Sequence, residues 1–298
     1  HLMKTPIFTG AATAIVTPFR GYSIDYNKMA ELIEQQVQGG ISCIVVCGTT
    51  GENATQPIEE HEKLVDFCVK KAAGRTKIVA GVGSNDTMTS VRLAESAKKS
   101  GVDGILMVTP YYNKATQRGL VQHFTTVADR VDVPMIVYNV PSRTGVGIKP
   151  ETYKILSEHP NINGVKEASG DLSLFARSRA LCQDDLYFWS GNDDNTIPMM
   201  AMGALGVISV ASNIIPETVT QLCNLCLKGD FKAATQLYFK YADLYEKLFI
   251  EVNPIPVKTA MNLLGMDVGG LRLPLCDMAP ENLEKLKKSL TDVGLKLK

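Results

Sequence analysis

The sequence predicts an α/β protein that folds as a parallel (β/α)8 barrel, a TIM barrel, with a small helical appendage at its C-terminal end. Three observations predict this fold. Short aliphatic runs alternate with amphipathic helical patterns along the chain. Eight such runs precede residue 229, and eight is the number at which a parallel barrel closes. No Gly-x-Gly-x-x-Gly follows the first run, which favours the barrel over a doubly wound open sheet.

The strands are expected in the eight aliphatic runs, which are almost continuously apolar because both faces of a barrel strand are covered. They span residues 11–19, 42–48, 77–83, 104–110, 134–140, 162–169, 186–192 and 206–211. Helical patterns lie between them at residues 26–38, 58–73, 87–99, 116–130, 150–158, 172–182, 195–202 and 216–227. Residue types that favour helix ends support these boundaries: Asp25, Asn85 or Asp86, and Asp171 before helices, Pro57, Pro150 and Pro216 in first turns, and Gly39, Gly40 and Gly101 after helices.

The pattern changes after Gly229 to three helical stretches without strands, at residues 231–249, 254–264 and 280–293. We therefore expect a catalytic barrel domain over residues 1–228 and a helical domain over residues 229–298. The uncharged run at 195–216 is about as long as a bilayer span, but Pro198 and Gly203 are among the residues that interrupt it. A buried helix followed by a buried strand is the expected structure there.

The charge balance and the cysteines indicate a cytoplasmic protein whose partners are small molecules. The 31 basic and 31 acidic residues balance, so nothing in the charge favours nucleic acid or a membrane as a partner. The seven cysteines are scattered in apolar surroundings, as free thiols in a reducing compartment would be, and Cys223 and Cys226 have the spacing of a core helix. The N-terminus has no apolar stretch long enough for a signal peptide, and His1 and Leu2 are typical of a cloning remnant.

Lys166 is the first candidate catalytic residue, because the carboxyl ends of barrel strands form the ligand site. A strand period of two places it on one face with Ile162, Gly164 and Ala168, and the two small residues leave space beside it. Burial would lower the pKa of the lysine and leave a neutral amine able to attack a ketone. The alternative is a strand-end lysine that reaches water or pairs with Glu167.

Residues at other strand ends are expected at the same open end of the barrel as Lys166. Thr49 and Thr50, in "GTTGE", can form a carboxylate cradle or simply a tight turn. Tyr138 can relay a proton and Arg143 can hold a carboxylate, or the two can be a hydroxyl bonded to backbone and an exposed arginine. Tyr111 and Tyr112 are more typical of packing or of an interface.

Several common chemistries have no support in the sequence. It contains no Gly-x-Ser-x-Gly elbow, no phosphate-binding loop and no His-Glu-x-x-His, and its histidines lie away from the strand ends. We therefore expect no metal and no cofactor. Asp193 and Asp194 lie near the mouth, but a helix-capping role explains them.

The motifs "GTTGE", "TPYYN", "YNVPSRTG", "GVKEASGD", "SGND", "GVISV" and "NPIPVK", in this order and spacing, resemble the 4-hydroxy-tetrahydrodipicolinate synthase family over essentially the whole chain. The resemblance implies condensation of pyruvate with L-aspartate 4-semialdehyde in diaminopimelate and lysine biosynthesis. It assigns the pyruvate Schiff base to Lys166, and proton relay to Tyr138, Thr49 and Tyr112, the last from a neighbouring subunit. It assigns pyruvate binding to Thr50 and to backbone near Gly191 and Ile208, and the semialdehyde carboxylate to Arg143.

The same resemblance implies a homotetramer built from tight dimers. Its regulatory pocket at the subunit junction would include Asn53, His61, Asn85 and Tyr111. Ile58 and Thr89 occupy positions where lysine-inhibited members commonly have a histidine and an acidic residue, so we expect feedback inhibition by lysine to be weak or absent.

Two alternatives to the synthase stay open at this point. One is an N-acetylneuraminate lyase or a 2-keto-3-deoxy sugar acid aldolase that uses the same Schiff-base chemistry, although Arg143 disfavours a polyol substrate. The other is a non-catalytic barrel that binds small acids, although such a protein has no use for a buried amine.

Overall fold

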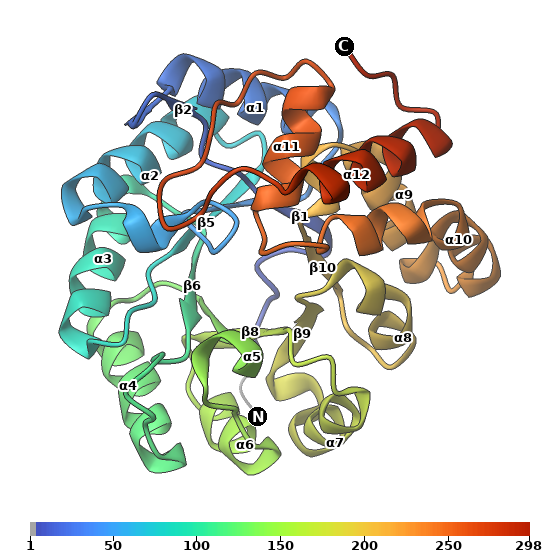
Figure 1. The fold of residues 1–298 in the computed structure, drawn as a ribbon. Helices are drawn as coiled ribbons and strands as arrows, with labels where there is room; N and C mark the ends of the chain where they lie inside the picture. Colours follow the sequence, from blue (N-terminus) through green and yellow to red (C-terminus); the bar gives the residue numbers. More distant parts are fainter. Residues whose placement is uncertain (1–3) are drawn as a thin grey trace.

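The computed structural model describes residues 4–298, and the cloning remnant expected at His1 and Leu2 lies outside this range. Eight parallel strands close into a barrel in the order β1-β10-β9-β8-β7-β6-β5-β4 (Figure 1). They are β1 (Gly10–Ala14), β4 (Cys43–Val46), β5 (Lys77–Gly81), β6 (Gly104–Val108), β7 (Met135–Asn139), β8 (Ile162–Glu167), β9 (Tyr187–Ser190) and β10 (Gly206–Ser209). The predicted barrel is confirmed, although each strand is shorter than its aliphatic run.

Helices follow the strands in turn and form a ring around the barrel (Figure 1). They are α1 (Tyr26–Gln38), α2 (Ile58–Ala72), α3 (Thr87–Ser100), α4 (Gln117–Arg130), α6 (Pro150–Ser157), α7 (Leu172–Cys182), α8 (Thr196–Ala201) and α9 (Pro216–Leu227). The C-terminal helical part comprises α10 (Phe231–Lys247), α11 (Ile255–Leu263) and α12 (Pro280–Asp292). It packs beside α8 and α9, on the side of the ring where β1 and β10 meet.

Most of the predicted helix starts have the expected caps. Asp25 accepts a hydrogen bond from the backbone N–H of Lys28, and Asp171 caps α7 in the same way. Pro57 lies just before α2 rather than in its first turn. Asp86 precedes α3, but its carboxylate accepts from the Thr89 hydroxyl instead of capping the helix backbone.

Two small elements have no signal in the sequence. A short hairpin of β2 (Phe19–Arg20) and β3 (Ser23–Ile24) lies between β1 and α1, and a single helical turn, α5 (Pro141–Thr144), follows β7. The uncharged run at 195–216 forms α8 and β10, as expected. No helix within residues 4–298 is long and apolar enough to cross a membrane.

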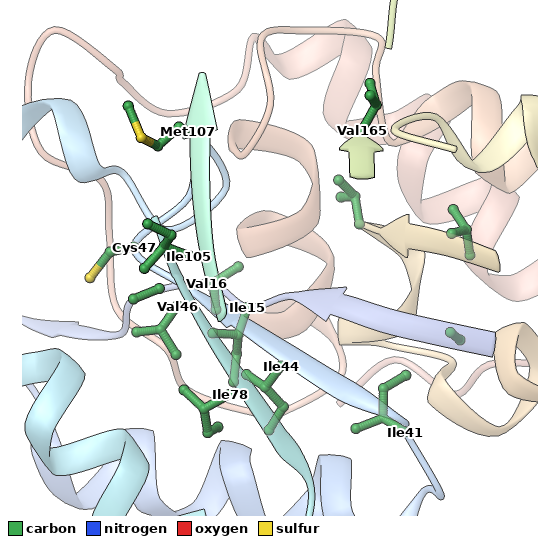
Figure 2. Close-up of a cluster of buried hydrophobic side chains, with 14 of the residues drawn as sticks. Ile15, Val16, Ile41, Ile44, Val46, Cys47, Ile78, Ile105, Met107 and Val165 are labelled. Atoms are coloured by element: carbon green, nitrogen blue, oxygen red, sulfur yellow. The ribbon is translucent and has the colours of Figure 1, made fainter. Parts of the chain in front are cut away.

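The strands separate two apolar clusters. Side chains that point inward fill the barrel, among them Ala12, Val45, Leu106, Ile136 and Trp189. Side chains that point outward pack under the helices, and Figure 2 shows part of this outer layer, including Ile44, Ile78, Ile105, Met107 and Val165. Because both faces are covered, the strands carry the continuous apolar runs that the sequence contains.

One prediction about strand β8 is wrong. The register between β7 and β8 shifts between Met135 and Ile136, so that Met135 pairs with Ile162 and Ile136 pairs with Gly164. This irregularity breaks the period of two, and Ile162 lies in the outer layer instead of sharing a face with Lys166. Gly164 does not leave space for a ligand either, because a Cβ there would overlap the Tyr187 carbonyl oxygen and lie 2.6 Å from the Trp189 ring.

Candidate active site

Lys166 and Tyr138 are direct neighbours on adjacent strands. They are paired in the register of β7 and β8, both are buried, and the Lys166 Nζ lies 4.1 Å from the centre of the Tyr138 ring. The lysine therefore does not extend to water. Its alternative partner, Glu167, points to the outer side of the barrel, where Asn139 and Tyr153 donate to its carboxylate. Neither structural explanation of Lys166 describes the arrangement found.

A second buried lysine, Lys258, provides a comparison for the surroundings of Lys166. The Lys258 Nζ donates to Glu52 at 2.8 Å and to the carbonyl oxygens of Thr17 and Gly270 at 2.8 and 2.6 Å. Three acceptors hold this ammonium in place and occupy its protons. Within residues 4–298 the Lys166 amine has no ion-pair partner and lies over the Tyr138 ring, so it is not held by acceptors as the Lys258 ammonium is.

The loop after β4 carries both threonines. Thr49 is half-buried, whereas Thr50 is fully buried and its Oγ1 accepts a hydrogen bond of 2.9 Å from the Asn253 side chain. Because this oxygen acts as an acceptor, the Thr50 hydroxyl proton remains for another partner. The loop is more than a bare turn, since a residue from the C-terminal part fixes one of its two hydroxyl groups.

A cavity of about 350 Å³ opens beside these groups. Its lining includes six of the predicted functional residues: Thr49, Asn53, His61, Tyr111, Tyr138 and Arg143. Ile58 and Thr89, which replace the expected histidine and acid, also line it. Lys166 is not part of the lining, but its Nζ lies 4.1 Å from the ring centre of Tyr138, which is. The structure thus places two of the four predicted catalytic residues, Tyr138 and Thr49, around one space with Arg143 and three of the predicted regulatory residues.

Arg143 lies on the single turn α5, at the edge of the site. Its side chain is exposed, and Nη2 donates to the backbone oxygen of Asn253 at 3.3 Å. This bond leaves most of the guanidinium donors available to a carboxylate. Asn253 therefore contacts both Arg143, through its backbone, and Thr50, through its side chain.

The two adjacent tyrosines have different surroundings. Tyr112 is 87% exposed and has a positive φ of 78°, and its side chain is not part of the cavity lining. Tyr111 is less exposed, and its backbone oxygen accepts from Asn85 at 3.1 Å. Asn85 itself does not line the cavity. His61 is bonded to the Gly81 carbonyl oxygen at 2.6 Å, and burial lowers the pKa of this histidine.

Gly191 directly follows β9 and Ile208 lies within β10, and both are outside the cavity lining. The Gly191 N–H donates to the backbone carbonyl oxygen of Glu167 at 2.8 Å, and a Cβ at position 191 would lie 2.6 Å from the Cβ of Ala168. The Ile208 side chain is buried inside the barrel. Neither position has a side chain that could bind a polar ligand, so each could contribute only backbone atoms.

Several residues that shape the site were not found from the sequence. Glu52, Asn253 and Lys258 come from segments about two hundred residues apart, and only the motif "NPIPVK" hinted at the last two. The capping role expected for Asp193 is also wrong, because its carboxylate does not cap the helix that follows it. Its buried carboxylate accepts from the Ser209 hydroxyl and from the backbone N–H groups of Val210 and Ala211, and burial raises its pKa.

The site therefore has hydroxyl groups and a guanidinium at the cavity, and an amine in contact with the ring of Tyr138, which lines it. In residues 4–298 no group of three or more His, Cys, Asp or Glu side chains is arranged to hold a metal ion. The chemistry that these residues offer is nucleophilic attack by an amine, with proton transfer through Tyr138 and Thr49.

Comparison with known proteins agrees with this chemistry. The model of the dihydrodipicolinate synthetase family matches residues 7–293. A 4-hydroxy-tetrahydrodipicolinate synthase from a Thermoanaerobacter species is 49% identical over 97% of this chain and 98% of its own length. The crystal structure of dihydrodipicolinate synthase from Aquifex aeolicus has a TM-score of 0.96 and 48% identity, covering 98% of this chain and all of that one. That of the Cyanidioschyzon merolae enzyme with lysine bound has a TM-score of 0.95 and 38% identity, with coverage of 98% and 100%.

Proposed function

This chain belongs to the dihydrodipicolinate synthetase family, and from that membership we propose how its residues carry out the reaction. It is a carbon–oxygen lyase (EC 4.3.3.7) that condenses pyruvate with L-aspartate 4-semialdehyde to give 4-hydroxy-tetrahydrodipicolinate, the first committed step of diaminopimelate and lysine biosynthesis. The observation that supports the residue roles is the buried amine of Lys166 above the ring of Tyr138.

In the proposed mechanism the Lys166 amine adds to the ketone carbon of pyruvate. Loss of water then leaves an imine between the two, and loss of a methyl proton gives an enamine. The enamine carbon attacks the aldehyde carbon of the second substrate, and the amino group of that substrate displaces the lysine as the ring closes. Tyr138 and Thr49, both at the cavity, relay the protons that these steps release and consume.

Substrate binding is divided between two groups of residues, one for each substrate. Thr50 and the backbone of Gly191 and Ile208 bind the pyruvate end, and the free hydroxyl proton of Thr50 suits a carboxylate acceptor. Arg143 binds the carboxylate of the semialdehyde, since its guanidinium is exposed at the mouth. No cofactor is needed, because the imine supplies the electron sink.

We also propose that the active form is a homotetramer, a dimer of dimers, in which Tyr112 completes the proton relay of a neighbouring subunit. An aromatic side chain that is 87% exposed next to the site supports this role, because exposure leaves its hydroxyl free to reach another chain. Sedimentation equilibrium that finds a fully active monomer would contradict it.

The seven free cysteines suit the cytoplasm. Residues 1–228 and 229–298 form the proposed domains.

Borohydride trapping tests the Schiff base. The protein is reduced in the presence of pyruvate, digested and mapped by mass spectrometry, and we expect one adduct, on Lys166. The control is Lys166→Met, which should give none. An adduct on Lys258 instead, or no adduct at all, would contradict the assignment.

A second assay tests the partner substrate. Turnover of L-aspartate 4-semialdehyde should exceed cleavage of N-acetylneuraminate and of 2-keto-3-deoxygluconate. Arg143→Ala should raise the KM for the semialdehyde and leave pyruvate trapping unchanged. Faster turnover of either sugar acid would support the aldolase alternative.

A further inference from the structure

A buried carboxylate lies directly behind the reactive pair. Glu167 follows Lys166 on β8 and is buried on the outer side of the barrel wall. Its Oε1 accepts from the Asn139 side chain at 2.9 Å and from the Ser169 backbone N–H at 3.1 Å, and its Oε2 accepts from the Tyr153 hydroxyl at 2.5 Å. The proposed reaction uses none of these three side chains.

The register shows what this carboxylate joins. Tyr138 pairs with Lys166, and the next residues along the same two strands, Asn139 and Glu167, pair with each other. Side chains alternate across a strand, so the first pair points into the barrel and the second points out. The bond between Asn139 and Glu167 thus ties the two strands together one residue beyond the reactive pair.

The same two residues also connect the neighbouring segments. The Asn139 Oδ1 accepts from the Ile148 N–H at 3.1 Å, which fixes the chain that follows Arg143. Backbone bonds of 2.9 Å from Ala168 to Asn139 and of 2.8 Å from Gly191 to Glu167 continue the connection to both sides. Four segments that carry proposed site residues therefore meet at Glu167 and Asn139, through their side chains and their backbone.

The arrangement is costly, which indicates that it has a purpose beyond packing. Within residues 4–298 Glu167 has no ion-pair partner, and burial raises its pKa, although the hydrogen bonds from Tyr153, Ser169 and Asn139 oppose this. A buried carboxylate without a countercharge is expensive unless its oxygens are satisfied. Here three donors satisfy it: Asn139 on β7, Tyr153 on α6 and the backbone N–H of Ser169, two residues further along its own segment. The carboxylate therefore holds β7 and α6 in position relative to β8.

We propose that Glu167 is a positioning residue for the reaction, which holds the Lys166 amine and the Tyr138 hydroxyl in register through its hydrogen bonds to Asn139 and Tyr153. This role rests on the function proposed above. It predicts that disturbing Glu167 slows the formation of the imine more than it weakens the capture of pyruvate. The reason is that a small misplacement of reacting groups lowers the rate while the carboxylate-binding groups stay where they are.

Glu167→Gln tests the proposal, because it keeps the shape of the side chain and removes the charge. We expect kcat and the single-turnover rate of adduct formation on Lys166 to fall about 10- to 100-fold, with the KM for pyruvate changed less than about threefold. Tyr153→Phe, which removes one donor and leaves the bond to Asn139, should lower kcat by a smaller factor. It keeps the test open if the first variant does not fold.

A double variant separates positioning from packing. Asn139→Asp alone places two carboxylates together and should lower kcat strongly. Asn139→Asp combined with Glu167→Gln lets the glutamine amide donate to the new carboxylate, which restores a bond between the strands in the opposite direction. We expect the double variant to recover part of the kcat lost in Asn139→Asp.

Asn163→Ala is the matched control, at the opposite end of the same strand. Asn163 ties β8 to the N-terminal segment through Ile7 and Thr5, so its loss should lower stability and leave kcat unchanged in the folded protein. The proposal is overturned if Glu167→Gln lowers the thermal midpoint as Asn163→Ala does while kcat stays at the wild-type value. A wild-type protein that forms no adduct with pyruvate would instead contradict the proposed function itself.

Discussion

The Lys258 ammonium and the Glu52 carboxylate lie 2.8 Å apart in the interior of the protein, although 206 residues separate them in the sequence. Lys258 belongs to α11, and Glu52 ends the loop that carries Thr49 and Thr50. The other oxygen of Glu52 accepts from the Arg272 backbone N–H at 3.1 Å. The C-terminal helical part thereby holds the loop that supplies the threonines of the site.

Lys258→Met should destabilise the protein by about 3–5 kcal/mol, because it leaves the Glu52 carboxylate buried without its partner. Lys258→Met combined with Glu52→Gln should cost less than the single change, since neither charge is then left alone. Urea unfolding followed by circular dichroism measures both values. A double variant that is less stable than Lys258→Met would contradict this explanation.

Gly164→Ala should cost about 1–3 kcal/mol or more, because its Cβ would overlap the Tyr187 carbonyl oxygen, a backbone atom that cannot move freely. Gly170→Ala is the control. Gly170 has a positive φ of 75° but no neighbour within 4 Å, so only the conformational cost of about 1–2 kcal/mol applies. We expect Gly164→Ala to be the less stable of the two by urea unfolding. A Gly164→Ala variant as stable as the wild type would show that strand β8 relaxes around the added methyl group.

His123 should make stability depend on pH. Burial lowers the pKa of His123 from 6.5 to about 4, while its ring shares a hydrogen bond of 2.8 Å with the Thr87 hydroxyl. Between these two values the unfolded chain binds a proton that the folded chain does not, so stability is full above pH 6.5 and falls as the pH drops toward 4. The limit of this loss is about 3 kcal/mol.

Urea unfolding at several pH values checks this dependence. In His123→Leu the loss between pH 6.5 and 4.5 should be smaller, even though the Thr87 hydroxyl is left without its partner at every pH. A variant with the same pH slope as the wild type would assign the slope to other groups, such as His61, whose pKa burial also lowers.

Lysine should inhibit this enzyme weakly or not at all. Ile58 and Thr89 line the cavity where a histidine and an acidic residue are expected, and the Thr89 hydroxyl already donates to Asp86 at 2.6 Å. The pocket therefore lacks a carboxylate at position 89 that could bind an ammonium group of the inhibitor lysine. A steady-state assay with added lysine measures the effect, and half-maximal inhibition at micromolar lysine would contradict the prediction. Ile58→His combined with Thr89→Glu should increase the inhibition.

The sequence predicted the helices better than the strand ends. Helices α1, α7 and α9 begin and end at the predicted residues, because periodicity and capping depend on neighbours within a few positions. Strand ends depend on pairing with other strands, and all eight strands are shorter than their aliphatic runs. The shift at Ile162 has no local signal, since it arises from how β8 meets Met135 and Ile136.

The sequence by itself determined the barrel, its helical ring and the chemical groups at the strand ends, including Lys166 and Tyr138. Only the tertiary structure decided which hydrogen-bond and ion-pair partners the buried polar groups have. It paired Glu52 with Lys258, placed Asn139 and Tyr153 on Glu167, and left the Lys166 amine without an ion pair among the described residues. The physical reason is that a buried charge is stabilised by groups close in space, and closure of the barrel brings those groups from distant parts of the chain.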